Sequence, residues 1–326
     1  MSTWEQAIQH FLKYLPDSMS SWFVLLEYPA HQQIEKFLIP RIRLKELFVL
    51  GKADPVRLIE AGREYALNED IGVIEFLIKD GRSHYGGLDY YDGLLEFSYW
   101  PCHRVKLCLD IWDDNFPLLF AENPLSLRER CYKISERLKR EPLLEYQHGS
   151  PLSNSLFLSC PASWTTYSGF EEFDYILPTG ETACLPQDVN GVLALEGWII
   201  GTIPFGLKYG RVEHGDLVLY LKDCQVQKVT GNNSSLCADF ETALLKLPGL
   251  RSVVEVGVGQ SLAVKQAARN QAVGCLWHER HFGVHLGLGA ELPETFDADQ
   301  RVTSHHIDLV METGVLRGSN DVLMQW

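Results

Sequence analysis

The feature that most constrains this chain is its C-terminal run of residues 253–310, where short apolar strings carry glycines and metal-capable side chains together. The strings VVEVGVG and FGVHLGLG are rich in valine and leucine, interrupted by glycine, and too short for ordinary helices, which favours buried strands. Five of the eleven histidines fall within 29 residues of one another: His278, His281, His285, His305 and His306. We therefore expect a sheet that gathers ionisable side chains at a common point.

Glu255 is the carboxylate in the middle of VVEVGVG. Burying an unpaired charge among valines and glycines is costly, so this side chain requires a cation, a metal or several hydrogen bonds. The alternative is that Glu255 points to solvent from an edge strand.

His306 and Asp308 are separated by one residue, so in a strand both side chains point to the same face. His285 lies between glycines that leave room for a ligand to approach. Two histidines and a carboxylate form the usual ligand set of non-haem Fe(II), and the same atoms suit Zn(II) or Mn(II). We predict that Glu255, His285, His306 and Asp308 bind a divalent metal, with Fe(II) favoured and Zn(II), Mn(II) or Co(II) as alternatives.

The segment WHERH precedes this histidine strand. Glu279 lies six residues before His285, where it could bind a second metal or act as a general base. The alternative is a polar loop at the rim of a cleft. His305 is expected to point away from His306. Glu181, after the turn in ILPTGE, has no chemical role by itself.

Composition restricts the function further. The 326 residues carry a net charge of -14, which disfavours nucleic acid, because phosphate binding needs clustered Lys and Arg. No apolar run reaches the roughly 18 residues needed to span a bilayer. The N-terminus lacks the basic and apolar regions of a signal peptide, so we expect a cytoplasmic protein. The eight scattered cysteines, with no CxxC pair, predict free thiols, mostly buried.

A change in sequence pattern, from mixed helix and strand to mostly strand, divides the chain into two predicted domains, 1–150 and 151–326. The boundary is placed at the polar string YQHGSPLSNS. The first domain is expected to be a small α/β module, a candidate for binding substrate or partner. Its expected helices are most of 1–44, 54–67 and 124–143, its expected strands 47–50, 71–78, 105–112 and 118–121, and its expected hairpin 79–100.

The second domain alternates strand-like runs with Gly, Pro and Asn turns and is expected to be mostly β sheet. Helices are expected at 238–247 and 262–272. The predicted fold class is α+β, a small N-terminal α/β module followed by a mostly β C-terminal domain.

The ordered strings ILPTGE, DVNGVL, VVEVGVG, GVHLGLG and SHHIDLV resemble the metal-dependent aminopeptidase T and S family and its relative 2,5-dihydroxypyridine dioxygenase. The resemblance covers about residues 150–315. It implies the catalytic-domain fold of that group and metal ligation by Glu255, His285, His306 and Asp308. In place of the segment that supplies the ligand for a second metal in the aminopeptidases, this chain reads WHERHFGVH, where only Glu279 could serve. The first 150 residues do not match.

Three functions follow as expectations. The first is a mononuclear, oxygenase-like metalloenzyme that acts on a peptide or small aromatic substrate, with Glu255 or Glu279 as catalytic base. The second is a metallo-aminopeptidase. The third is a repurposed peptide-binding protein that presents a precursor peptide to partner enzymes in natural-product biosynthesis. The expected partner is a peptide or small molecule, not nucleic acid or membrane, and a homodimer is left open.

Overall fold

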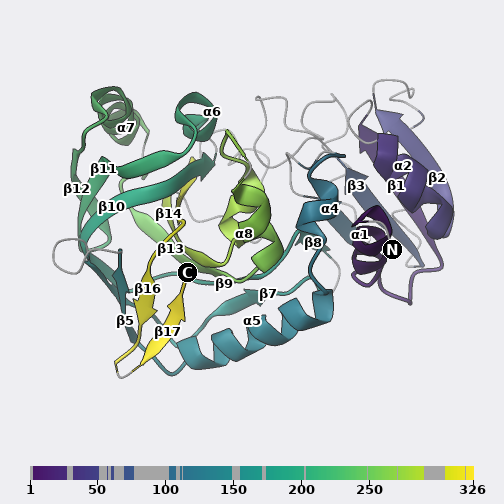
Figure 1. The fold of residues 1–326 in the computed structure, drawn as a ribbon, viewed down its shortest axis with the longest axis horizontal. Helices are drawn as coiled ribbons and strands as arrows, with labels where there is room; N and C mark the ends of the chain where they lie inside the picture. Colours follow the sequence, from purple (N-terminus) through teal and green to yellow (C-terminus); the bar gives the residue numbers. More distant parts are fainter. Residues whose placement is uncertain are drawn as a thin grey trace. The chain divides into compact units, whose positions relative to one another are not determined.

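The computed structural model (Figure 1) describes residues 3–27, 32–50, 57, 60, 61, 70–76, 103–107, 111, 113–148, 155–170, 174–201, 203–247, 249–269, 271–289, 305–319 and 321–326. Internal contacts separate the chain into two compact units. Unit 1 is Met1–Arg128 with Tyr167–Thr179, and unit 2 is Glu129–Thr166 with Gly180–Trp326. The domain division near residue 150 stays a prediction, and the names unit 1 and unit 2 are used below.

Unit 1 is built on a parallel five-stranded sheet in the order β2-β1-β3-β4-β8. The strands are β1 (Ser21–Glu27), β2 (Leu44–Leu50), β3 (Ile71–Phe76), β4 (Arg104–Leu107) and β8 (Asp174–Leu177). All six residues of β3 are buried, as expected for a parallel sheet covered on both faces.

Its helices are α1 (Thr3–Leu12), α2 (Gln32–Leu38), the 3-10 turn η1 (Ile39–Arg41) and α4 (Phe116–Leu119). The apolar stripe of α1 buries Ala7, Ile8 and Phe11, because these positions recur at helical spacing. Phe11 packs against Phe76 on β3 and Phe116 on α4, with ring centroids 5.8 Å apart in each pair. Helix α5 (Pro124–Leu138) begins in unit 1 and ends in unit 2.

The prediction that 1–44 is largely helical is wrong, because 21–27 form β1, whose apolar run suits a central buried strand. The strand predicted at 118–121 is also wrong: 116–119 form α4, with Pro117 in the first turn, where its fixed φ suits a helix. The helix predicted at 124–143 ends at Leu138. Most of the helix predicted at 54–67, and the whole hairpin predicted at 79–100, lie outside the described residues.

Unit 2 contains an antiparallel twelve-stranded sheet that curls rather than lying flat (Figure 1). The main path runs β17-β16-β5-β6-β10-β15-β14-β13-β9-β7, and β11 and β12 extend from β10. The strands are β5 (Leu143–Gln147), β6 (Ser155–Ser159), β7 (Thr165–Tyr167), β9 (Glu181–Cys184), β10 (Asp188–Gly201), β11 (Val212–Lys222), β12 (Gln225–Thr230), β13 (Val253–Gly259), β14 (Gly283–Gly289), β15 (His306–Met311), β16 (Val315–Arg317) and β17 (Val322–Gln325).

The remaining helices of unit 2 are α6 (Phe205–Tyr209), α7 (Ser234–Lys246), α8 (Leu262–Ala268) and the 3-10 turn η4 (Leu276–Arg280). α7 begins where the Asn233 side chain accepts a hydrogen bond from the Leu236 amide, a standard N-cap. The predicted α+β class, an α/β module and a mostly β domain, is confirmed. The helices expected at 238–247 and 262–272 both form, with shifted ends.

Two further expectations concern the chain as a whole. Among the described helices, none has both the length and the apolar character that crossing a bilayer requires. The six cysteines within the described ranges are free thiols: Cys131, Cys160, Cys184, Cys224, Cys237 and Cys275.

Candidate metal centre

Four neighbouring strands of unit 2 carry the site, three of them with the predicted ligands. In the order β15-β14-β13-β9, each strand brings ionisable residues to the same region of the sheet. They are Glu181 on β9, Glu255 on β13, His285 on β14, and His306 and Asp308 on β15. The adjoining η4 turn adds Glu279 and Arg280.

Glycines on neighbouring strands make room for these side chains. Gly257 is paired with His285, and a Cβ atom at Gly257 would lie 2.0 Å from His285 Nε2. Gly287 is paired with Glu255 on one side and Asp308 on the other, and a Cβ there would lie 2.8 Å from His306 Cε1. The imidazoles therefore lie over the adjacent strand, where any larger residue would collide with them.

The four predicted ligands converge. His306 Nε2 is 3.0 Å from Asp308 Oδ1, because both residues point to one face of β15. Glu255 lies between the two histidines, with Oε1 3.4 Å from His285 Nε2 and Oε2 3.8 Å from His306 Nε2. The Glu255 side chain is 25 % exposed, so it opens toward solvent while the other three are almost fully buried. The alternative in which Glu255 points to solvent from an edge strand is wrong, because β13 pairs with both β9 and β14 and the carboxylate faces the histidines.

Glu181, Glu279 and Arg280 complete the cluster. Glu181 Oε1 lies 2.8 Å from His285 Nε2, and its Oε2 lies 2.6 Å from Arg280 Nη1. Arg280 also forms an ion pair with Glu279. Glu279 offers a donor atom to the same small space as His285 and Asp308, since these three ligand atoms lie within 4.8 Å of one another.

The electrostatics divide the four carboxyl groups into two kinds. Burial would raise the pKa of Asp308, but the charge and hydrogen bond of His306 lower it to about 2. Burial opposes ionisation of Glu181 as well, yet Arg280 and His285 hold its pKa below the usual value. Burial is the largest influence on Glu255 and raises its pKa, and burial raises the pKa of Glu279 well above the usual range.

His285 behaves in the opposite way to an ordinary buried histidine. Burial would lower its pKa, but hydrogen bonds to Glu181 and Glu255 raise it well above its usual range. The pKa values of His285, Glu255 and Glu279 are therefore all raised, which favours their protonated forms. A metal that binds these donor atoms competes with protons for them.

The remaining histidines of the sequence cluster do not join the centre. His281 is buried and its Nε2 donates to the Met311 carbonyl at 2.7 Å. His278 is buried between Trp277 and Trp198, with ring centroids 4.3 and 4.5 Å away. The alternative of a polar rim loop at WHERH is therefore wrong, because both histidines are core residues. His305 belongs to none of the ligand groups found among the described residues.

The residues present fit a divalent cation. Among the described residues, three overlapping ligand groups share this space: Glu181–Glu255–His285, Glu255–His306–Asp308 and Glu279–His285–Asp308. Imidazole nitrogen with carboxylate oxygen is the donor set of Fe(II), Zn(II) and Mn(II) sites. The cluster contains four carboxyl groups and one guanidinium, which pairs with Glu181 and Glu279, so the fully deprotonated cluster carries excess negative charge that a cation would neutralise.

Sequence reasoning missed two members. Glu181 was noticed only as part of a turn motif, although the structure gives it contacts to both His285 and Arg280. Arg280 was not singled out at all. Its position next to Glu279 was the one available signal, since a cation beside a buried carboxylate is a frequent way to stabilise that charge.

Comparisons with known proteins add the fold-level context. No protein-family model and no curated sequence matches this chain, so the resemblance to aminopeptidases stays an expectation. Among solved structures, the chain is similar to 2,5-dihydroxypyridine dioxygenase from Pseudomonas putida KT2440. The identity is 12 %, the TM-score is 0.63, and the match covers 100 % of this chain and 96 % of the other. At that identity the likeness establishes a shared fold, and the chain therefore has the fold of that dioxygenase.

Proposed function

We propose that this protein is a metal-dependent enzyme of the non-haem oxygenase type, with one divalent metal held by Glu255, His285, His306 and Asp308. The convergence of these four side chains within one buried, glycine-lined part of the sheet carries the proposal. The shared fold with a dioxygenase gives further support. Fe(II) is favoured because His285, His306 and Asp308 form the two-histidine, one-carboxylate set of non-haem Fe(II) enzymes, and a six-coordinate ion that also binds Glu255 still has positions open for substrate.

A bound divalent metal would supply positive charge that binds and polarises an oxygen-bearing group of the substrate. Arg280 holds the Glu181 carboxylate beside His285 Nε2, where Glu181 is a further oxygen donor for the ion. His306 Nε2 and Asp308 Oδ1 lie 3.0 Å apart, so the two residues can bind one ion together.

Glu279 is the proposed acid–base group. Its carboxyl is held near His285 and Asp308, and burial raises its pKa well above the usual range, which favours the protonated acid. Glu255 is the second candidate, because its pKa is also raised and its side chain is 25 % exposed, within reach of a substrate. A peptide or a small aromatic compound is the proposed substrate class.

Metal analysis of protein purified without chelator tests this function. We expect one iron per chain in wild type, and loss of that iron in His306→Ala. His305→Ala is the matched control, since it removes the neighbouring imidazole without touching the ligand group. If His306→Ala keeps the wild-type iron content, the ligand assignment is wrong.

A metallo-aminopeptidase is the second candidate, favoured by one observation. Glu279 lies with His285 and Asp308 in a ligand group that overlaps the first, so the cluster has more donors than one ion requires. Two neighbouring ions would activate a water molecule for attack on a peptide bond. Two zinc or cobalt ions in wild type, one of which is lost in Glu279→Gln, would support this candidate over the oxygenase.

The third candidate, a peptide-binding protein, would need no metal in the cluster. Absence of any His306-dependent metal, together with stoichiometric binding of a peptide in calorimetry, would favour it. Recovery of the peptide after incubation with iron-loaded protein separates an enzyme from a binding protein. An enzyme consumes its substrate, whereas a peptide-binding protein releases the peptide intact.

A further inference from the structure

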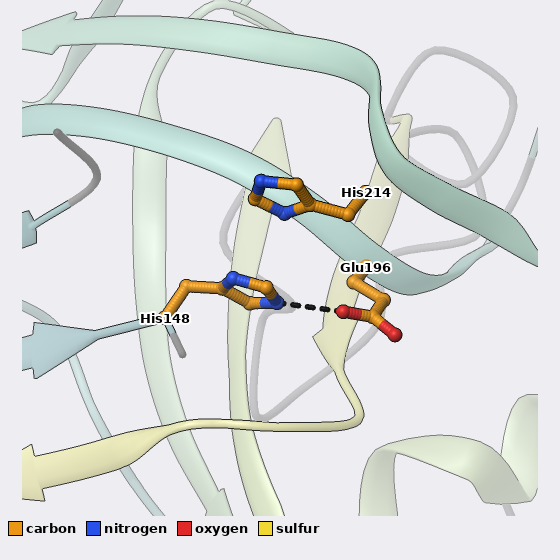
Figure 2. A group of neighbouring side chains, drawn as sticks. All are labelled: His148, Glu196 and His214. Carbon is orange, nitrogen blue, oxygen red and sulfur yellow. Dashed lines mark hydrogen bonds and ion pairs between the residues drawn. The ribbon is translucent and has the colours of Figure 1, made fainter. Parts of the chain in front are cut away.

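A second group of metal-capable side chains lies in unit 2, apart from the centre described above. His148 follows β5, Glu196 lies on β10 and His214 lies on β11 (Figure 2). Each offers a ligand atom, and these atoms lie within 4.8 Å of one another. His148 Nε2 is 2.8 Å from Glu196 Oε2, and the two imidazole rings stack with centroids 4.3 Å apart.

The sheet brings these residues together through a break in strand pairing. β10 and β11 pair regularly up to Leu195, and the register then shifts before Gly197 resumes pairing with Val212. Glu196 lies at this irregularity, opposite the segment that carries His214. Irregular pairing of this kind redirects side chains, and here it turns Glu196 toward His148.

One member of this group, His148, is almost completely buried. His148 is 7 % exposed, and its Nδ1 is a buried atom without a hydrogen-bond partner. Its Nε2 also lies 3.0 Å from Thr313 Oγ1, which is 3.4 Å from Glu196 Oε2. A nearly buried imidazole and a carboxylate are thus held in place on one side, while the exposed His214 leaves the other side open to solvent.

The charges around the group favour a cation. Arg211 Nη2 binds Glu196 Oε1 at 2.8 Å, so Oε2 is the oxygen that faces the histidines. The same guanidinium pairs with Glu213 and Glu312, both at 2.6 Å. Three carboxylates around one guanidinium leave two negative charges, which a divalent ion would neutralise.

We propose that His148, Glu196 and His214 form a second metal site for a zinc-class divalent cation. Two imidazoles and one carboxylate are borderline ligands that suit Zn(II), Co(II) or Ni(II) and are poor ligands for Mg(II) or Ca(II). Three protein ligands leave a fourth position open to water. A metal there joins the end of β5 to β10 and β11.

Metal binding requires a small local adjustment. Zinc bound to each donor at about 2.0–2.1 Å needs donor atoms about 3.3 Å apart. His148 and Glu196 must therefore separate slightly, exchanging their direct hydrogen bond for the metal. His214 must turn out of its stacked position so that a ring nitrogen faces the ion, which its exposure allows.

Zinc titration by calorimetry, followed by metal analysis of dialysed protein, tests the proposal. His214→Ala is the primary variant, because an exposed residue can be removed without threatening the fold. We expect it to lose one zinc equivalent or to weaken that zinc by about 100-fold or more, a larger loss than the 10- to 100-fold typical of residues outside the ligand set. His305→Ala is the matched control, because it also removes an imidazole but one outside every ligand group found among the described residues, and it is expected to retain the zinc.

His306→Ala separates the two sites, because it removes a ligand of the main centre and is expected to leave the zinc at His148 in place. Zinc addition is also expected to raise the melting temperature of His306→Ala but not of the His306→Ala/His214→Ala double variant. Equal zinc binding by His214→Ala and His305→Ala would overturn the proposal.

Discussion

Gly257 on β13 is paired with His285 on β14, and no side chain larger than hydrogen fits between them, because a Cβ at Gly257 would lie 2.0 Å from the imidazole Nε2. Gly257→Ala is therefore expected to displace His285 from the centre. Overpacking of a buried site typically costs about 1–3 kcal/mol, so we expect destabilisation of that size in urea unfolding. Metal content is expected to fall with it.

Gly318→Ala is the matched control. A Cβ there would meet the flexible Glu141 side chain at 2.6 Å, which can move aside. Stability and metal content are expected to stay at wild-type values in that variant. Wild-type metal content in Gly257→Ala would contradict the role of the glycine.

Arg280→Met tests the charge balance of the centre. Arg280 is the cation that faces Glu181 and Glu279, and its side chain is only 12 % exposed. Removing one partner of a buried ion pair commonly costs about 3–5 kcal/mol, so we expect a loss toward that range in denaturant unfolding of metal-free protein. Added divalent metal is expected to recover part of the loss.

Lys133→Met removes a solvent-exposed ion pair with Glu129 and serves as the comparison, with little change expected. An Arg280→Met protein as stable as Lys133→Met would mean that Glu181 and Glu279 are compensated by other groups.

Buried neutral histidines predict an acid-sensitive fold. Burial lowers the pKa of His281 to about 3 and that of His278 to about 4, whereas a histidine in the unfolded chain titrates near 6.5. Below pH 6.5 these two histidines bind protons in the unfolded chain but stay neutral in the folded chain. The stabilisation is therefore complete above pH 6.5 and is lost as the pH falls from there toward 4 and 3.

His281→Gln keeps a hydrogen-bond donor near the Met311 carbonyl and removes the titrating group. We expect its unfolding free energy to fall less steeply than that of wild type, by about 1.4 kcal/mol per pH unit between pH 6 and 4. Each protein is compared with its own value at pH 7. Identical slopes for the two proteins would contradict a neutral buried His281.

Protons and metal are expected to compete for the centre. Burial would lower the pKa of His285, but Glu181 and Glu255 raise it well above the usual value, so this imidazole still carries its proton at pH 6.5. Metal must displace that proton. Affinity is therefore expected to rise about tenfold per pH unit for each proton released, from pH 6.5 upward until the raised pKa is passed. Calorimetry in buffers of different ionisation enthalpy counts the protons, and pH-independent affinity would contradict this account.

Much of the fold was readable from local patterns. The alternation and glycine content of 253–259 and 283–289 predicted two strands that the structure contains. Residues 21–27 were misjudged, because a short apolar run has no periodicity that separates a buried strand from a helix. The membership of β8 in the sheet of unit 1 rests on pairing with β4, far away in sequence, which local patterns do not encode.

Some residues of the candidate centre were predictable from the local sequence, and others depend on the order of the strands. His306 and Asp308 were predictable because two-residue spacing in a strand fixes a common face. The contacts of Glu181 with His285 and Arg280 depend on the order β14-β13-β9, which no local signal in ILPTGE specifies. His278 and His281 looked polar in WHERH, yet tertiary packing buries both of them.

Anomalous diffraction from crystals grown with Fe(II) under anaerobic conditions tests the central claim most directly. The account predicts one strong peak at the iron edge, within bonding distance of Glu255, His285, His306 and Asp308. A crystal structure in which these four side chains face apart, or in which the iron peak lies elsewhere, would contradict it.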